Sequence, residues 1–380
     1  MCDTFEYWPI LPNEIKQLVI FEMDFDTRTM LSLCSKSDFE HVNNSKWKIE
    51  QMKIIENYQR IPGIYNMKRI RFVDIFIYFY PRKLIELRLY QKPDRENETF
   101  VMNKHYRKWR EKKSVFKNKN FRKVAIQMVE QFMRKNIYPI KCLYIKMDSP
   151  LLKPIFRKKW RHIKRFRIES RNVEYILSWI KELGSLDSLK VIAWDFDEST
   201  EKTLLPPEFF EKIEKNIFSC NEVVFCGIPK ITEKQFFNLN AANFTLNIDE
   251  DTLVTMSVIK SFILKWISGD IRDNFWRMRI LIDVDYDEDE FLEGIEAREW
   301  DQQFIQQSYS FCADFLKINN MKISDITTNC GIFEVCNKNN DLAATLVFDD
   351  CVILFVVTGK SHSGSMIHHI LYKLEHRVSK

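Results

Sequence analysis

The sequence contains few of the residues that build phosphate-binding turns and flexible linkers. Only 8 of its 380 residues are glycine. Glycine adopts positive φ angles at no steric cost, so tight phosphate loops and flexible linkers depend on it. We therefore expect a chain that is folded over most of its length and has no glycine-rich nucleotide loop. The one candidate, Gly359-Lys360-Ser361, has Leu354 where a phosphate-binding loop needs its first glycine.

Long apolar runs and paired cysteines are also missing. No stretch approaches the roughly 20 apolar residues that cross a membrane, and Met1 to Ile10 contains two acidic residues where a secretory signal has its apolar core. The 9 cysteines are odd in number and include no Cys-x-x-Cys pair. This usage is typical of small buried side chains in a reducing compartment. We expect a cytoplasmic or nuclear protein with no membrane partner.

No residues have the spacing of a catalytic or metal site. The acidic run from Asp283 resembles a calcium loop, but Glu288 and Gly294 stand where that loop needs glycine and glutamate. The four histidines of residues 362–376 lack cysteine or carboxylate partners at zinc-site spacing. No serine, cysteine or histidine lies in a nucleophile motif that we can name. The sequence therefore predicts a protein that is not an enzyme and needs no cofactor or metal.

Phenylalanine and locally concentrated charge are abundant. The chain has 30 Phe and 45% hydrophobic residues, which is enough for the cores of two or three domains. Residues 103–170 contain 22 Lys and Arg against 4 Asp and Glu, whereas residues 283–301 contain 10 acidic residues against the single Arg298. Two interpretations remain open. These can be the solvated faces of helices, or the basic stretch can form a surface for nucleic acid or an acidic partner.

Two clusters within the basic stretch bear on that choice. Residues 105–110 and 156–161 mix cations with aromatic side chains. Surfaces that bind nucleic acid have this mixture. Docks for acidic targets, and helix ends that use aliphatic stems to cover a core, can have it too.

The apolar pattern predicts an α+β/α/β chain that begins with an all-α unit. Residues 1–46 have the pattern of three short helices that begin near Pro12, Asp26 and Ser37. Residues 47–119 are predicted to be a connecting segment. It is rich in β-branched and aromatic residues over 70–80 and 84–90, which indicates strands, and it ends in a basic loop or solvated helix over 103–119.

Residues 120–380 repeat a strand followed by a helix at intervals of 21 to 35 residues. The strand markers are Leu143, Phe166, Val191, Val223, Phe244 and Arg279. Because one short strand with one helix cannot bury its apolar face alone, this pattern favours an irregular leucine-rich-repeat-like array of parallel strands lined by helices. Residues 332–336, 343–348 and 352–357 are predicted to close it as an antiparallel hairpin sheet, with a turn at 339–341 and a last helix over 366–374.

Two stretches resemble a known family. Leu11-Pro12-Asn13-Glu14-Ile15, followed by Leu31-Ser32-Leu33-Cys34-Ser35-Lys36, is similar to the F-box of the large nematode F-box families. Phe262-Ile263-Leu264-Lys265-Trp266-Ile267-Ser268-Gly269, followed by residues 278–282, looks like the F-box-associated type-2 domain of the same proteins, with the best match over 220–283. The hairpin of residues 331–336 and 342–357 is similar to their C-terminal ending. Glu22-Met23-Asp24 departs from the family pattern, which often has more leucine there.

The resemblance implies a non-catalytic adaptor of a Skp-cullin-F-box (SCF) type E3 ubiquitin ligase. An F-box binds a Skp-type adaptor, and through it a cullin, while the C-terminal domain of residues 120–380 holds an unknown protein target for degradation. The residues implied in adaptor binding are Leu11, Pro12, Ile15, Leu18, Leu31 and Leu33.

Two other readings remain open. The apolar side chains of the F-box-like unit could pack against residues 47–102, in which case they would leave no surface for a partner. The alternative function is a nucleic-acid-binding repeat protein that uses the basic 103–170 face, and a scaffold outside any ligase is a further possibility.

Overall fold

The computed structural model describes residues 7–23, 25–60, 69–79, 83–92, 95–105, 108–137, 139–147, 162–193, 204–217, 220–239, 241–271, 275–300, 312, 315, 331–338, 342–349 and 351–360. The chain divides into two compact units. The first comprises Met1–Ile168 with Glu182–Gly184, and the second Glu169–Lys181 with Ser185–Lys380. In the part of the chain that the structure describes, no helix is long and apolar enough to cross a membrane.

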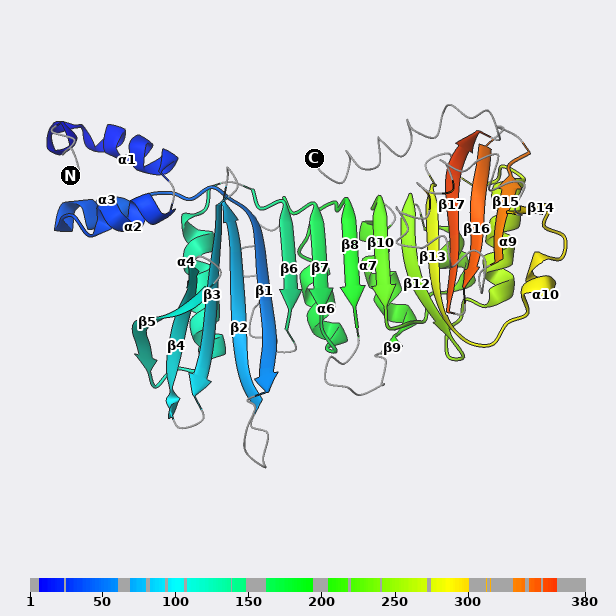
Figure 1. Ribbon diagram of the computed structural model, residues 1–380, viewed down its shortest axis with the longest axis horizontal. Coiled ribbons are helices and arrows are strands. Elements are labelled where there is room, and N and C mark those ends of the chain that lie inside the picture. Colours follow the sequence, from blue (N-terminus) through cyan, green and yellow to red (C-terminus); the bar gives the residue numbers. More distant parts are fainter. Residues whose placement is uncertain are drawn as a thin grey trace. The chain divides into compact units, whose positions relative to one another are not determined.

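The first unit begins with three short helices, drawn in blue in Figure 1. They are α1 (Asn13–Glu22), α2 (Phe25–Ser32) and α3 (Lys36–Asn44), preceded by the single turn η1 (Trp8–Ile10). Pro12 occupies the N-cap of α1, beside a first turn whose N–H groups have no partner within the helix. Ser35 caps α3, because its hydroxyl oxygen accepts the backbone N–H of Asp38 at 3.0 Å.

Five strands follow and pair in chain order as an antiparallel meander. They are β1 (Ile49–Arg60), β2 (Arg69–Phe79), β3 (Lys83–Lys92), β4 (Arg95–His105) and β5 (Lys108–Lys117). Helix α4 (Phe121–Lys135) covers one face of this sheet, with Val124, Val129 and Met133 buried. On its other side β1 pairs in parallel with β6 (Cys142–Lys146), and β7 (Arg165–Glu169) lies next to β6.

The expectation of a loop or solvated helix over residues 103–119 is wrong. These residues complete β4 and form β5, and β5 is the last strand in the order of the sheet. An edge strand that carries many charged side chains is protected against pairing with other chains. The same charges mask the apolar alternation by which a strand is recognised from sequence.

The second unit begins with strands that pair in parallel in the order in which they follow one another along the chain. They are β8 (Ser188–Ile192), β10 (Glu222–Cys226), β12 (Asn243–Asp249) and β13 (Arg277–Asp283). The helices of this region are α6 (Val173–Ile180), α7 (Pro207–Ile217), α8 (Glu233–Phe237) and α9 (Met256–Ile267), and the short strands β9 (Leu204–Leu205) and β11 (Ile228–Pro229) pair separately. All six predicted strand markers lie in strands of the chain.

The abundant phenylalanine fills the space between these strands and helices. Phe236 of α8, Phe244 of β12 and Phe262 of α9 contact one another edge-to-face, with ring centroids 5.5 Å apart in each pair. Phe275, just before β13, extends the cluster at 5.1 Å from Phe262. Aromatic rings prefer this tilted packing because their faces are negative and their edges positive.

The second unit ends in antiparallel strands. From β13 the sheet continues through β17 (Val352–Lys360), β16 (Leu342–Asp349), β15 (Gly331–Cys336) and β14 (Ala297–Glu299), with α10 (Glu288–Leu292) before β14. The predicted hairpin sheet is therefore present. The predicted turn at 339–341 and the last helix over 366–374 lie outside the described residues.

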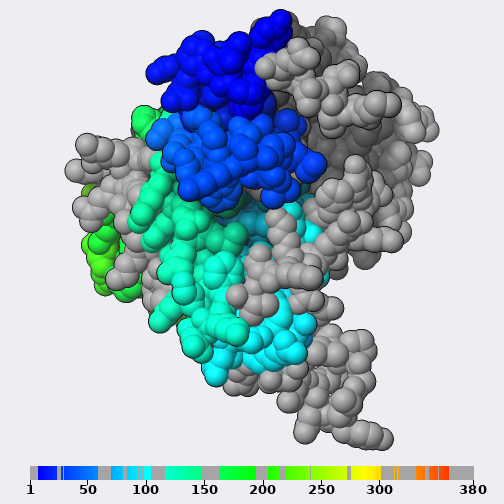
Figure 2. Space-filling model, turned by 90° about the vertical axis from the view of Figure 1, so that its left-hand side faces the viewer, coloured from blue at the N-terminus to red at the C-terminus, as the bar shows by residue number. Residues whose placement is uncertain are grey.

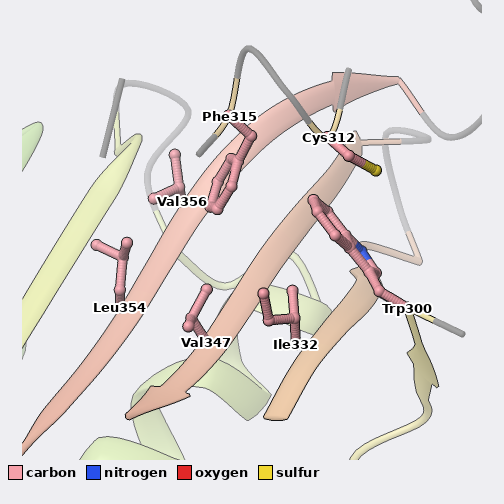
Figure 3. Close-up of a cluster of buried hydrophobic side chains, with 7 residues drawn as sticks. All are labelled: Trp300, Cys312, Phe315, Ile332, Val347, Leu354 and Val356. Carbon is pink, nitrogen blue, oxygen red and sulfur yellow. The ribbon is translucent and has the colours of Figure 1, made fainter. Parts of the chain in front are cut away.

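A hydrophobic cluster packs on one face of this antiparallel sheet. Trp300, Cys312 and Phe315 lie over side chains of β15, β16 and β17, as Figure 3 shows. The strand residues are Ile332, Val347, Leu354 and Val356. Phe355, whose side chain points to the other face, packs edge-to-face on Trp266 of α9 at 5.1 Å. Both faces of the antiparallel sheet therefore lie inside a core.

Candidate functional site

Exposed apolar side chains are concentrated on the first three helices. Thirteen described large hydrophobic residues are exposed, and eight of them fall between Tyr7 and Phe39. The eight are Tyr7, Ile10, Ile15, Leu18, Val19, Met30, Leu33 and Phe39. The blue atoms of Figure 2 show the surface of this stretch. Folded monomers rarely leave a large apolar patch in water, so such a concentration marks a surface that a partner covers.

The residues predicted to bind the adaptor differ in how far they are exposed. Pro12, Ile15, Leu18 and Leu33 are exposed, with Leu18 at 61% and Leu33 at 75%. Leu11 and Leu31 are half-buried. The four exposed residues are therefore not packed against residues 47–102, which was the competing expectation. The structure contains no partner, so the role of these six residues in adaptor binding stays a prediction.

Helix α1 is amphipathic, but part of its apolar side faces water. Ile15, Leu18 and Val19 share one side because they are three and four residues apart, and all three are exposed. The opposite side contains Lys16 and Ile20, and both are buried. The Nζ of Lys16 donates to the carbonyl oxygen of Pro9 at 3.1 Å.

Helix α3 packs against both α1 and α2. The carboxylate of Asp38 is buried and accepts hydrogen bonds from Trp8 Nε1 and from the Ser35 hydroxyl, each at 2.7 Å. Gln17 of α1 donates from Nε2 to the carbonyl oxygen of His41 at 3.0 Å. These polar contacts help to hold the helices together. Few apolar side chains are buried between the helices, so most of them stay at the surface.

Arg28 of α2 fastens the three helices to the chain that leaves them. It is only 2% exposed. Its guanidinium donates to the carbonyl oxygens of Phe21 at 2.9 Å and Met23 at 3.1 Å, at the C-terminal end of α1. It also donates to the Ser45 hydroxyl at 3.1 Å and to the carbonyl oxygen of Lys46 at 2.8 Å. A cation is favourable at a helix C-terminus, where carbonyl groups have no partner within the helix.

The charge of Arg28 survives this burial. Burial lowers its pKa to about 10, partly offset by the carboxylate of Glu22. The group is therefore still positive at neutral pH. Its guanidinium carbon also lies 4.5 Å from the ring centroid of Trp47, a cation–π distance.

Trp47 and Asn136, the residue that follows α4, hold the start of β1 in place. The backbone N–H of Trp47 donates to Lys135 O at 3.0 Å, and the N–H of Ile137 donates to Trp47 O at 3.2 Å. The side chain of Asn136 accepts the backbone N–H of Ile49 at 2.9 Å. Arg28 stacks on the Trp47 ring and Asn136 binds the backbone of Ile49, so side chains of α2 and of the residue after α4 hold the segment that leads into β1.

Several residues of this surface are not among those predicted to bind the adaptor. Ile10 precedes the Leu11-Pro12 motif, Val19 lies four residues after Ile15, and Met30 lies three before Leu33. Helical spacing could have found the last two, because it places them on the same side as predicted residues. Nothing local marks Arg28 as buried, since an arginine on a short helix is normally exposed.

The other sequence features give no site in the described residues. The side chains of residues 104–115, and all of residues 151–161 and 361–380, lie outside them, so the two basic-aromatic clusters and the C-terminal histidines are not described. Across the described ranges, no group of three or more His, Cys, Asp or Glu is placed to hold a metal ion.

Comparison with known proteins finds a relative with an informative description. A protein of Caenorhabditis elegans described as an uncharacterized F-box protein is 22% identical to this chain over 318 residues. The similarity covers 82% of this chain and 79% of that protein, so it extends far beyond the first three helices. No protein-family model matches the chain, and no solved structure matches it significantly. The chain is thus similar, over most of its length, to a protein classed as an F-box protein.

Proposed function

We propose that this protein is a substrate-recruiting subunit of an SCF-type ubiquitin ligase. In this proposal α1–α3 are the F-box, which binds a Skp-type adaptor and through it a cullin in the cytoplasm or nucleus. The observation that carries the proposal is the exposed apolar surface of these helices, in the stretch that carries the F-box-like motifs. The similarity to an F-box protein over 318 residues supports it independently.

The exposed side chains suit a helical partner. An amphipathic partner helix recognises anchors at intervals of three and four residues. Ile15, Leu18 and Val19 of α1 are spaced in this way. Leu33, which is 75% exposed at the end of α2, and Met30 before it add anchors on the second helix. Burying each of these side chains fully would contribute roughly 1.5–3 kcal/mol.

The rest of the chain would hold the target. We interpret the parallel strands and helices of the second unit as an irregular leucine-rich-repeat-like array, similar to an F-box-associated domain. No catalytic group is required of it, because the ligase works by holding a target near a ubiquitin-charged enzyme and so raises its effective concentration. The hydrogen-bonded connection through Arg28, Trp47 and Asn136 would keep the F-box in a fixed position on the first unit.

The test is co-purification with a purified Skp-type adaptor. The test variant is Leu18→Asp/Leu33→Asp, because both side chains are exposed and their replacement leaves the core intact. The control variant is Leu204→Asp/Leu253→Asp, which makes the same chemical change at two leucines of the second unit, each 45% exposed. We expect the wild-type chain and the control to bind the adaptor and the test variant to bind at least about 100-fold more weakly, since two anchors are lost.

Two results would refute the proposal. One is a folded wild-type chain that does not bind the adaptor. The other is equal loss of binding in the test and control variants, which would show that the first three helices are not the specific interface. A circular-dichroism melt of each variant establishes that it is folded.

A further inference from the structure

The parallel strands of the second unit have one face that points away from helices α8 and α9. On the helix side, Phe244 of β12 packs edge-to-face on Phe262 of α9 at 5.5 Å. Met278 of β13 is in register with Phe244, so it points to the same side, where it is completely buried. Side chains alternate between the two faces of a strand. We define the strand face by residues of the opposite side, namely Ser188, Lys190, Glu222, Asn243, Thr245, Asn247, Arg277 and Arg279.

Two neighbouring arginines lie on the strand face. Arg277 and Arg279 are two residues apart on β13, about 7 Å along the strand. They are in register with Asn243 and Thr245 of β12. Arg277 is half-buried and Arg279 is exposed. In the part of the chain that the structure describes, neither guanidinium forms an ion pair or a hydrogen bond, and Nε of Arg277 is buried without an acceptor.

The carboxylate in the same row of the sheet is engaged by other groups. Glu222 of β10 is in register with Asn243, which is itself in register with Arg277. The carboxylate of Glu222 pairs with Lys190 at 3.0 Å and accepts a hydrogen bond from the Ser188 hydroxyl at 2.6 Å. The charge of Lys190 is therefore balanced within the sheet, and the charges of the two arginines are left over.

These two positive charges act on each other. Burial lowers the pKa of Arg277, and the neighbouring charge of Arg279 lowers it further, partly offset by Glu222. The acidic residues Asp249 and Asp283 end β12 and β13, about 13 Å beyond Arg279 along the strands. A bound anion between the arginines would remove their repulsion and give the buried donor of Arg277 an acceptor.

An apolar wall borders the arginines on the side of β17. Val356 and Leu354 are paired directly with Arg277 and Arg279, so they point to the same face. Both belong to the hydrophobic cluster of Figure 3. Trp276 packs against this cluster, with its ring centroid 6.0 Å from the guanidinium carbon of Arg277. Such apolar surroundings strengthen the attraction between a guanidinium and an anion.

The charge and the donors suit a phosphate monoester. This group carries about −1.5 to −2 charges at neutral pH and has three strong acceptor oxygens, so it can balance two arginines. A carboxylate has one charge and would balance only one of them. Guanidinium groups bind phosphate through two parallel N–H donors. Within the described residues, the side chains of Asn243 and Thr245 make no hydrogen bond, so both can donate as well.

A neighbouring amide favours a phosphate that a polypeptide carries. Asn247 lies two residues after Thr245 on the strand face and is only 8% exposed. Its Oδ1 is buried and accepts no hydrogen bond in the part of the chain that the structure describes. A backbone N–H beside a phosphorylated residue could supply that donor, whereas free phosphate offers no backbone N–H. The phosphodiesters of nucleic acid carry one charge each, which would again balance a single arginine.

We propose that Arg277, Arg279, Thr245 and Asn243 bind a phosphorylated side chain of a protein target. The proposal deepens the proposed function, because it names the chemistry of the target. It rests on that function only for the consequence of binding. Binding of the phosphorylated segment itself does not require the adaptor and can be measured without it.

The test is fluorescence anisotropy of labelled alanine peptides, whose central residue is phosphoserine or phosphotyrosine, titrated with the full chain at low ionic strength. The test variants are Arg277→Gln/Arg279→Gln and, separately, Thr245→Val, which removes a hydroxyl without changing the charge. The control is Lys212→Gln/Lys234→Gln. It removes the same charge as the double variant at two exposed positions of α7 and α8.

We expect saturable binding of a phosphopeptide by the wild-type chain. The double variant should bind at least about tenfold more weakly and the control less than about threefold, since contacting charges matter more than net charge. Thr245→Val should weaken binding about tenfold, because a hydrogen bond to a charged group is lost. Arg279→Gln alone should weaken binding less than the double variant, and it serves if that variant does not fold. Adaptor binding by each folded variant should equal that of the wild type, which separates this inference from the proposed function.

Several results would overturn the inference. Absence of phosphopeptide binding by the folded wild-type chain, or equal weakening by the double variant and the control, would show that the arginines are not the site. A peptide with a central glutamate that binds as tightly as the phosphopeptides would show that one carboxylate is enough. Equally tight binding of inorganic phosphate would reduce the site to one for the free ion. Tighter binding of an oligouridylate that depends on Arg277 and Arg279 would make it a nucleic-acid site.

Discussion

Arg28 offers the most direct test of how the first three helices are held. Replacing it with alanine removes four hydrogen bonds, to Phe21 O, Met23 O, Ser45 Oγ and Lys46 O, and the cation–π contact with Trp47. Removing one side of a buried charged network costs about 3–5 kcal/mol, because the partners left behind lose their hydrogen bonds without regaining water. We expect Arg28→Ala to destabilise α1–α3 by this amount.

Hydrogen exchange measured by mass spectrometry reports the local stability of α1–α3. A three-helix unit of this size has only a few kcal/mol of its own stability, so Arg28→Ala should abolish most protection over residues 13–44. Protection in β6 and in the central residues of β1 should persist, because α4 and the strand pairs still support them. The control is Arg134→Ala. That side chain is exposed and makes a 3.9 Å ion pair with Glu130, so its loss should cost less than about 0.5 kcal/mol.

The reasoning fails if Arg28→Ala changes the free energy of opening of α1–α3 by less than about 1 kcal/mol, a typical value for one neutral hydrogen bond. That result would mean that the remaining contacts, such as the hydrogen bonds of Asp38 and Gln17 and the burial of Ile20, hold the helices without Arg28. Arg28→Lys provides an intermediate case. It keeps the charge but loses the planar fork that reaches four acceptors at once, so it should recover less than half of the loss.

Two further predictions concern the second unit. A Cβ at Gly331 would meet the carboxylate of Glu288 and approach the Phe333 ring to 2.8 Å, so Gly331→Ala should lower the free energy of unfolding in urea by about 1–3 kcal/mol. Adding Glu288→Ala should recover part of that loss, and an additive double variant would contradict the contact. Burial raises the pKa of the Cys220 thiol from 9.0 to about 12, so iodoacetamide at neutral pH should label exposed Cys34 and spare Cys220 in the native protein. Because the raised pKa favours the protonated native thiol, its contribution to stability is complete below about pH 9 and should be lost between about pH 9 and 12; equal labelling of both cysteines would refute the burial.

Strands of the second unit could be predicted because apolar residues on their buried face alternate with partly exposed ones. In β12, buried Phe244, Leu246 and Ile248 are two residues apart. The closing strands β16 and β17 are buried on both faces, and continuous apolar runs mark them. Periodicity carries this information because burial selects the side chains directly.

The first unit was harder to predict because its pattern is disguised by charge. Strand β5 carries lysine and arginine along most of its length and lies at the edge of the sheet, so no apolar alternation marks it. Strand β1 mixes charged residues with its buried ones, since Glu56 accepts a hydrogen bond from Arg122 of α4 and Lys53 points to the other face of the sheet. The role of Arg28 depends on carbonyl groups brought together only by the fold.

The candidate site, too, could be predicted only in part. The Leu11-Pro12 and Leu31-to-Lys36 motifs lie on or beside the helices that expose apolar side chains, but sequence could not tell exposed Leu18 and Leu33 from half-buried Leu11 and Leu31. Which apolar side chains remain in water is settled by the packing of α3 against both other helices.

Calorimetric titration of the full chain with a purified Skp-type adaptor tests the central claim most directly. The account predicts saturable binding with a negative heat-capacity change, the signature of apolar burial, and its loss in Leu18→Asp/Leu33→Asp. A folded wild-type chain that produces no binding heat at several temperatures would contradict the claim that the first three helices are an adaptor-binding F-box.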